Sequence, residues 1–158
     1  MSNMRIERVT APTDDVRTLI GELDATLSAN YPPEQRHGLA LDAIFQPHMR
    51  FYLAWRDRAA VGCGGVALFD DFAEVKRMYV RETARGHGVA QAILAQLEAT
   101  ARIANLPVLR LETGTEQHAA IRLYERAGFT ICGAFGDYAA MDPKLITTSV
   151  FMEKQLRP

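Results

Sequence analysis

The segment "RETARGHGVA" (residues 81–90) places two glycines, a histidine and an arginine between an apolar run and a helix-like run. Gly86 and Gly88 flank His87, and Arg85 comes directly before them. The first turn of a helix exposes unpaired N–H groups and about half a positive charge, and glycines leave room beside it for a bulky anion. The pattern predicts a phosphate site. The alternative is that the glycines only form a tight turn between a strand and a helix.

Familiar nucleotide motifs do not fit this segment. A dinucleotide-binding fingerprint would need a third small residue where Gln91 stands, and the Gly-Lys-Ser/Thr of a P-loop is absent. A pattern of Arg-x-x-Gly-x-Ala, formed by Arg85, Gly88 and Ala90, fits instead. A second segment, "AAIRLYERAGF" (residues 119–129), follows it after a strand-like "VLRLETG".

With both motifs in this order, the sequence resembles the GNAT N-acetyltransferase superfamily over almost its whole length. That family carries Gln/Arg-x-x-Gly-x-Gly/Ala between a strand and a long helix, and a later helix that ends in Tyr followed by Gly-Phe. The segments "KRMYV", "LETG" and "SVFMEK" also resemble a bacterial subgroup of small-molecule type. One departure is Gln117, which stands where many relatives carry Asn but keeps an amide that donates and accepts hydrogen bonds.

The resemblance implies that acetyl-CoA is the cosubstrate. The preceding strand would pair with its pantetheine arm and separate from the strand of "VLRLETG" to make room for it. Backbone N–H groups of the glycine turn would hold the diphosphate, and they belong to Arg85, Gly86, His87, Gly88, Val89 and Ala90. The other residues expected beside the cosubstrate are Met78, Tyr79, Val80, Gln117, Ala120 and Tyr124.

Acetyl transfer to an amine needs a general base, because a free alkyl amine with a pKa of about 10 is protonated at neutral pH. Glu74, in "FAEVKRMYV", occupies the place of a catalytic glutamate in some relatives. Strand alternation puts Glu74, Lys76, Met78 and Val80 on one face, which would be the cosubstrate side. The alternative is an exposed glutamate at a strand start, paired with Lys76 or Arg77.

Tyr124 stands at the family position of the group that protonates or hydrogen-bonds the departing CoA thiolate. The alternative is a core tyrosine, because Ala120, Leu123 and Ala127 form an apolar stripe beside it.

The loops that vary within the family would cover the acceptor, and two segments of this chain lie there. Tyr31 and His37 belong to "NYPPEQRH" (residues 30–37), and Tyr138 follows the Gly-Phe strand. All three are candidates for acceptor contact, with ordinary surface positions as the alternative. The histidines His37, His48 and His118 have no metal-ligand spacing, so no metal is expected.

Composition limits the function classes. The chain has 158 residues, a net charge of −1, 48% hydrophobic and 23% charged residues, as in one soluble globular domain over residues 1–158. Near-neutral charge disfavours nucleic acid and acidic membrane surfaces as partners, and no apolar run reaches the length of a membrane span. Two distant cysteines and the absence of a signal-peptide pattern indicate a cytoplasmic protein, and a homodimer is compatible with the sequence.

Hydrophobic periodicity predicts alternating strands and helices. Glycines 62, 64 and 65 within one expected strand indicate a bulge or the close approach of another group. Strands are expected at 4–10, 72–80, 107–114, 129–135 and 145–153, with two more within 50–69, and helices at 12–30, 34–45, 88–106 and 116–128. The order predicts an α/β fold of GNAT type: a six- to seven-stranded, mixed, mostly antiparallel sheet with helices on both faces.

These observations together predict an acetyl-CoA-dependent N-acetyltransferase. The expected acceptor is the primary amine of a small molecule or amino-acid-like compound, acetylated by direct transfer. Two alternatives remain open at this point. One is a peptide or protein N-acetyltransferase, which would need an open cleft rather than a closed pocket. The other is a non-catalytic module that binds acyl-CoA.

Overall fold

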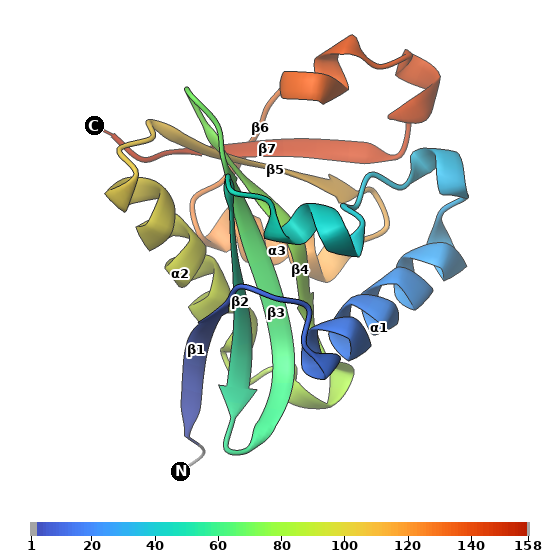
Figure 1. Cartoon of the computed structure of the whole chain (residues 1–158). Helices are drawn as coiled ribbons and strands as arrows, with labels where there is room; N and C mark the ends of the chain where they lie inside the picture. The colour runs from blue at the N-terminus through green and yellow to red at the C-terminus, as the bar shows by residue number, and fades with distance from the viewer. Residues whose placement is uncertain (1–2, 158) are drawn as a thin grey trace.

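The computed structural model describes residues 3–157, and its centre is a sheet of seven strands in the order β1-β2-β3-β4-β5-β7-β6 (Figure 1). All neighbouring strands are antiparallel except β4 and β5, which are parallel. The mixed, mostly antiparallel sheet predicted from the sequence is confirmed. The strands are β1 (Met4–Val9), β2 (Met49–Arg56), β3 (Ala59–Leu68), β4 (Ala73–Val80), β5 (Val108–Gly114), β6 (Thr130–Ile131) and β7 (Ser149–Gln155).

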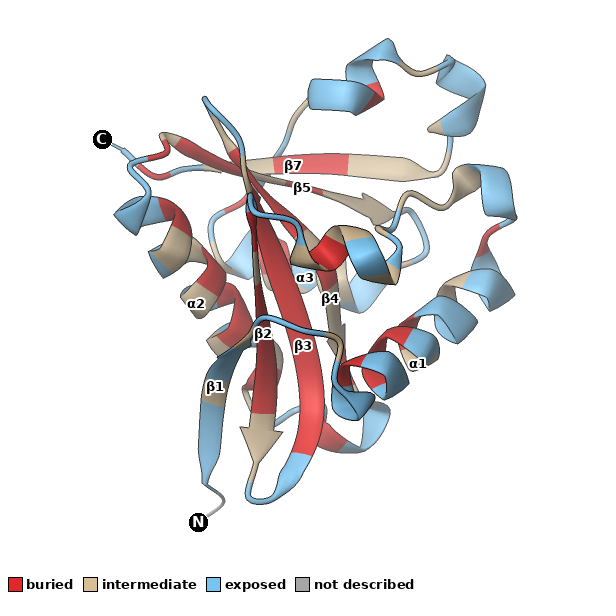
Figure 2. Ribbon diagram, viewed as in Figure 1, coloured by how far each residue is buried: buried red, intermediate tan, exposed pale blue. Residues whose placement is uncertain are grey.

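Helices α1 (Asp14–Asn30) and α2 (Val89–Ile103) cover opposite faces of the sheet (Figures 1 and 2). The Thr13 side chain accepts a hydrogen bond from the Val16 N–H at 3.3 Å and begins α1 as predicted. Each helix buries its apolar stripe in a separate core cluster, one around Phe51 and Leu53 beneath α1 and one around Ile93 and Leu97 of α2. Helix α3 (His118–Arg126) follows β5 and ends before Gly128, whose φ is +101°.

The helix predicted over residues 34–45 is wrong. This stretch forms two short 3₁₀ turns, η1 (Pro33–Gln35) and η2 (Leu41–Phe45), separated by extended chain. The side chains of Gln35 and His37 hydrogen-bond to the carbonyl oxygens of Lys144 and Leu145, more than 100 residues away. These contacts fix residues 33–45 against a segment near the C-terminal end of the chain. The local hydrophobic pattern cannot predict such long-range contacts.

The two C-terminal strands are shorter or later than predicted. Strand β6 contains two residues of the predicted 129–135, and β7 begins at Ser149 rather than at 145. The chain between them forms two 3₁₀ turns, η4 (Gly136–Ala140) and η5 (Pro143–Leu145). Another 3₁₀ turn, η3 (Glu82–Ala84), joins β4 to the glycine turn.

A bulge changes the direction of the side chains along β4. Cys63 pairs with Tyr79 and Gly65 with Lys76, so two residues of β4 lie opposite one residue of β3, and Arg77 has a φ of +55°. The alternation therefore shifts at Arg77, and Val80 packs in the same cluster as Val75. The prediction that Glu74, Lys76, Met78 and Val80 share one face is wrong for Met78 and Val80, which both follow the bulge. The glycines of β3 are explained by close approach: a Cβ at Gly64 would lie 2.7 Å from Ile93 Cγ2 of α2, and one at Gly62 would lie 2.9 Å from the Tyr79 carbonyl oxygen.

The parallel strands β4 and β5 separate soon after they begin. Their pairing consists of Ala73 with Leu109 and Glu74 with Arg110. Beyond these pairs β5 continues to pair with β7, and β4 with β3. The strand separation that the family resemblance implied is confirmed, and it opens the sheet between the C-terminal halves of β4 and β5.

Candidate functional site

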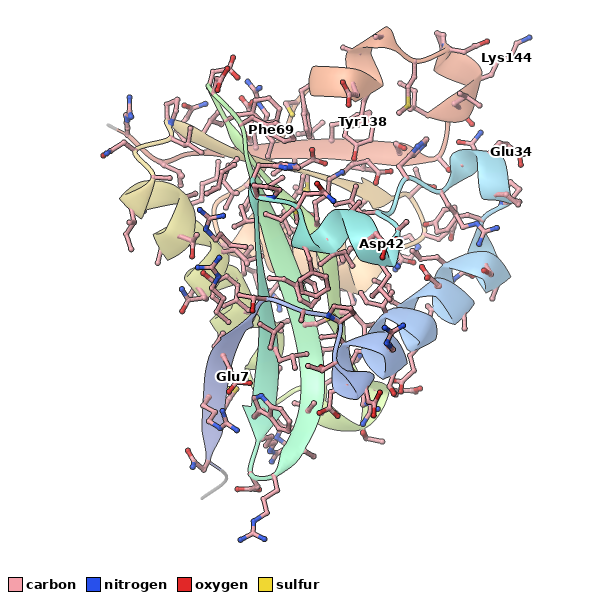
Figure 3. The ribbon with its side chains drawn as sticks, viewed as in Figure 1. Glu7, Glu34, Asp42, Phe69, Tyr138 and Lys144 are labelled. Atoms are coloured by element: carbon pink, nitrogen blue, oxygen red, sulfur yellow. The ribbon has the colours of Figure 1, made fainter. Side chains whose placement is uncertain are left out.

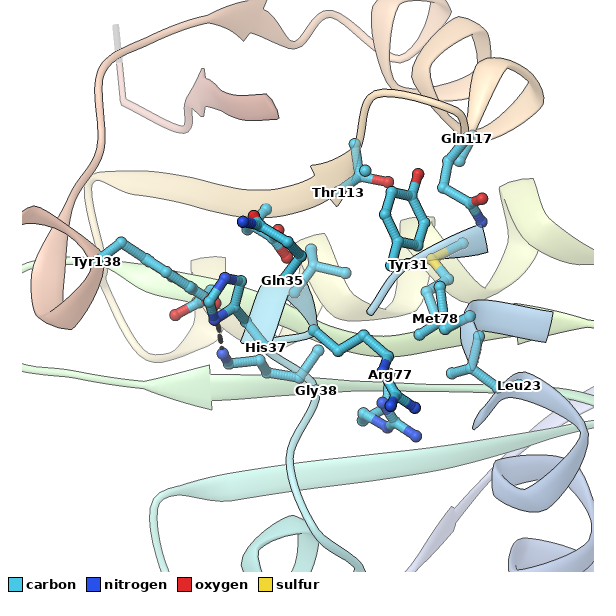
Figure 4. Close-up of a pocket in the computed structure, with 18 of the residues that line it drawn as sticks. Leu23, Tyr31, Gln35, His37, Gly38, Arg77, Met78, Thr113, Gln117 and Tyr138 are labelled. Carbon is cyan, nitrogen blue, oxygen red and sulfur yellow. Dashed lines mark hydrogen bonds and ion pairs between the residues drawn. The ribbon is translucent and has the colours of Figure 1, made fainter. Parts of the chain in front are cut away.

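A pocket lies where β4 and β5 diverge (Figure 4). Its lining comes from α1, the loop after α1, β4, β5, α3 and η4, which are far apart in the sequence. Figure 4 shows His37 and Tyr138 at one end and Gln117 at the other, with Tyr31 and Met78 near the second end. The sequence-predicted residues Tyr31, His37, Glu74, Met78, Gln117, Ala120, Tyr124 and Tyr138 all line it.

The glycine turn leads directly into α2. Gly86 and Gly88 have φ values of +82° and +79°, in the left-handed region that favours glycine, and Gly88 caps α2 without a side-chain hydrogen bond. Among the described residues, no hydrogen-bond acceptor meets the backbone N–H groups of residues 86–90. The Arg85 side chain donates from Nε to the Val80 carbonyl at 3.1 Å and holds the turn against the end of β4.

Tyr124, on α3, is buried and presents its hydroxyl to the pocket. Its ring packs edge-on against Phe129 with the centroids 5.7 Å apart. No residue within the described part of the chain hydrogen-bonds this hydroxyl. Burial raises the pKa of Tyr124, helped by the charge of Glu112, so the phenol stays protonated at neutral pH.

Glu74, Lys76 and Tyr138 form a closed triangle of polar contacts. Lys76 Nζ lies 2.8 Å from Glu74 Oε2, the Tyr138 hydroxyl donates to the same oxygen at 2.8 Å, and Lys76 Nζ donates to the Tyr138 hydroxyl at 2.9 Å. The predicted pairing with Lys76 is present, but Glu74 is 4% exposed rather than at the surface. Burial and the charge of Glu74 raise the pKa of Tyr138, which stays a neutral donor.

At the end of the pocket near His37 and Tyr138, residues 31–38 line the pocket and are held by residues 142–148; we call these two segments the roof. Gln35 Nε2 donates to the Lys144 carbonyl at 2.6 Å, and its Oε1 accepts from the Thr148 hydroxyl at 3.2 Å and from the Thr148 N–H at 3.4 Å. His37 Nε2 lies 2.7 Å from the Leu145 carbonyl oxygen. Figure 3 shows Glu34 and Lys144 on these two neighbouring segments at the outer end of the molecule.

Tyr31 and His37 are fixed by contacts of their own. The Tyr31 hydroxyl accepts from the Glu116 N–H at 2.9 Å, and a Cβ at Gly114 would lie 2.0 Å from its oxygen. Glycine is therefore needed where β5 passes beneath Tyr31. The His37 ring meets the Tyr138 ring edge-on, with the centroids 5.8 Å apart.

Among the β4 residues predicted to contact the cosubstrate, Tyr79 and Val80 have side chains outside the pocket. The Tyr79 hydroxyl donates to Glu22 Oε1 of α1 at 3.0 Å, and Val80 packs against α2. Both residues offer only their backbone to the space between β4 and β5.

Sequence reasoning missed Glu112, which lies on β5 and lines the pocket. The Ser149 hydroxyl of β7 donates to its Oε2 at 2.7 Å. Burial raises the pKa of Glu112 above the usual range for a carboxyl group. One sequence feature could have identified Glu112: it is a carboxylate near the end of the strand that was expected to separate from β4.

A model of the Acetyltransferase (GNAT) family matches residues 18–129 of this chain. The chain belongs to this family. It is therefore an enzyme of the acyltransferase class. A curated relative, IAA acetyltransferase of Azospirillum brasilense, is 42% identical over 99% of this chain and 100% of its own length.

Solved structures of GNAT enzymes have the same fold. A protein from Klebsiella pneumoniae, described as an acyl-CoA N-acyltransferase, is 36% identical, covers 97% of each chain and has a TM-score of 0.75. An acetyltransferase from Salmonella typhimurium, solved with its cofactor acetyl-CoA, is 20% identical over 99% of this chain and 96% of its own, with a TM-score of 0.70. The second likeness concerns the fold alone.

Within residues 3–157, no helix combines the length and apolarity of a membrane crossing. Among the same residues, no three His, Cys, Asp or Glu side chains are grouped as a metal site would require.

Proposed function

We propose that this GNAT enzyme transfers the acetyl group of acetyl-CoA directly to the primary amine of a small molecule. The observation that carries the proposal is the separation of β4 and β5, which opens the sheet beside the glycine turn and leads to a pocket where Tyr124 and two carboxylates meet.

The glycine turn fits the diphosphate of acetyl-CoA. Five consecutive residues, 86–90, have N–H groups without a described partner, and no atom within 4 Å would meet a Cβ at Gly86. These N–H groups and that of Arg85 would hold the diphosphate at the positive end of α2. The backbone of residues 78–80 would flank the pantetheine arm, and Gln117 and Ala120 would lie beside its thiol end. Bound there, acetyl-CoA supplies the activated acetyl group.

Tyr124 is assigned to the departing thiolate. A thiol comparable to cysteine has a pKa of about 8.5, well below that of a buried phenol, so Tyr124 stabilises the thiolate by donating a hydrogen bond rather than by losing its proton outright. The absence of a described partner leaves this hydroxyl available to the sulfur.

Glu74 could act as the base, or it could act indirectly by positioning other groups of the pocket. Lys76 and Tyr138 both engage its Oε2. We assign Glu74 a positioning role exerted through the hydroxyl of Tyr138, because Lys76 and Tyr138 already occupy its Oε2.

The roof favours a small acceptor over a peptide. Hydrogen bonds from Gln35 and His37 tie its two segments together across the end of the pocket, where a peptide would need an open groove. The name of the 42% identical relative, IAA acetyltransferase, also supports a small-molecule acceptor.

The test is an assay of thiol release from acetyl-CoA with alkylamines, polyamines, amino acids, arylalkylamines and short peptides. Release above the rate without acceptor is expected for at least one small amine and not for peptides. If none of the compounds raises thiol release above that background, catalysis on amines is contradicted. If only peptides raise it, the assignment of a small acceptor is overturned.

A further inference from the structure

Glu112 differs from Glu74 in its partners. It forms no ion pair within the described residues, and its hydrogen-bond donor is the neutral hydroxyl of Ser149, which engages only Oε2. Its other oxygen, Oε1, has no described donor. Oε1 of Glu74 likewise has no described donor, so the two carboxylates that line the pocket differ in charge pairing: Glu74 forms an ion pair with Lys76, and Glu112 forms none among the described residues.

Glu112 also interacts electrostatically with several titratable side chains of the pocket. Lys76 and His37 favour its ionised form and Glu74 opposes it, while its own charge raises the pKa of Tyr31, Tyr124 and Tyr138. These groups come from β4, the loop after α1, α3 and η4. Glu112 thus lines the same pocket as Tyr124, His37 and Tyr138.

We infer that Glu112 binds the acceptor as an ammonium ion and removes the proton that makes its nitrogen a nucleophile. This inference rests on the proposed function and names the form in which the acceptor enters: a cationic primary amine. A hydroxyl or thiol acceptor would leave the carboxylate without a counter-charge.

The step balances in atoms and charge. One proton of R–NH₃⁺ passes to Glu112, which becomes a neutral carboxylic acid and later releases the proton to solvent. The nitrogen lone pair forms the C–N bond, and the C–S bond breaks with its electron pair going to sulfur, where Tyr124 donates a hydrogen bond. A second proton leaves the nitrogen and ends on the sulfur, so the products are the N-acetylated amine, the free thiol and one proton.

A carboxyl with a raised pKa suits this task, because proton transfer is most efficient when the pKa of the base approaches the working pH. Burial raises the pKa of Glu112, and the Ser149 hydroxyl counters this by stabilising the ionised form. A Glu112 with a purely structural role would also accept this hydrogen bond. A test must therefore distinguish a general base from a residue that only stabilises the fold.

The experiment is the pH profile of kcat/KM with the best amine from the panel above. In the wild type we expect the rate to fall toward acid as Glu112 becomes protonated. Glu112→Gln keeps the size of the side chain and can still accept from Ser149, and it should remove this acidic limb and lower kcat/KM by about 100-fold or more. Glu74→Gln is the matched control and should retain the limb. CoA affinity by calorimetry should stay unchanged in both variants.

Ser149→Ala provides a second, independent test. It removes the hydrogen bond that favours the ionised carboxylate, so the pKa of Glu112 rises further and the acidic limb moves to higher pH. A limb that stays in place in both Glu112→Gln and Ser149→Ala would overturn the inference while leaving the proposed function intact. If no amine in the panel is acetylated, the proposed function fails and this inference fails with it.

Discussion

Tyr124 and Glu112 face the same pocket, but only one of them is marked by its sequence neighbours. Tyr124 belongs to a local pattern, a helix that ends in Tyr before Gly-Phe, and its position on α3 follows from that pattern. Glu112 depends on Ser149, which is 37 residues away, and on the divergence of β4 and β5. Such a role arises from tertiary contacts, so a single sequence without its structure does not reveal it.

Replacing Tyr124 with Phe tests the hydrogen bond to sulfur. A hydrogen bond to a charged group contributes about 1.5–3 kcal/mol, so Tyr124→Phe should lower kcat by about 10- to 100-fold. The KM for acetyl-CoA should change little, because the interaction forms as the thiolate departs. Phe keeps the ring that packs against Phe129, so the melting temperature should stay the same. An unchanged single-turnover rate would exclude Tyr124 from the reaction.

The strands and helices around the site were largely predictable, because each carries a local signal. Thr13 caps α1, the apolar stripe of α2 is regular, and glycines mark the turn before it. The predicted helix at 34–45 failed for the opposite reason, since Gln35 and His37 bind a distant segment. The bulge at Arg77 likewise depends on the pairing of β4 with β3 rather than on β4 alone.

The start of α2 gives a prediction that separates backbone strain from anion binding. Gly88 has a φ of +79°, so any side chain there costs about 1 kcal/mol of folding free energy. Gly88→Ala introduces this backbone strain but little steric conflict, because its Cβ would meet only Gln91 Oε1, at 3.8 Å. Gly88→Glu adds bulk and negative charge at the positive end of the helix.

By calorimetry, Gly88→Ala should weaken CoA binding by a few fold, and Gly88→Glu should weaken it by about 100-fold or more, since each tenfold corresponds to about 1.4 kcal/mol. Equal affinities for the two variants would remove the glycine turn from the diphosphate site.

Over the whole molecule, two segments that are far apart in the sequence meet beside the pocket. The loop after α1 and the segment before β7 form the roof, and Gln35 makes three of its hydrogen bonds. The roof lies at one end of the pocket, and the glycine turn is not part of it. The proposed function therefore assigns acceptor binding and cosubstrate binding to different parts of the fold.

Gln35→Ala should loosen the roof without affecting the glycine turn. We expect the KM for the amine to rise by about tenfold, which corresponds to about 1.4 kcal/mol, or roughly one to three of the hydrogen bonds lost. The KM for acetyl-CoA should remain the same. If both KM values rise together, the variant has disturbed the whole pocket, and the roof is not specific to the acceptor.

The central claim is direct acetyl transfer from acetyl-CoA to an amine in the pocket between β4 and β5. The most direct measurement follows acetyl-CoA labelled with carbon-13 at the acetyl carbonyl, by nuclear magnetic resonance, while the enzyme turns over with the best small amine. The account predicts that the label appears as an amide carbonyl, in equal amount to the thiol released. Label that appears as free acetate, as an ester, or only in unreacted acetyl-CoA would contradict it.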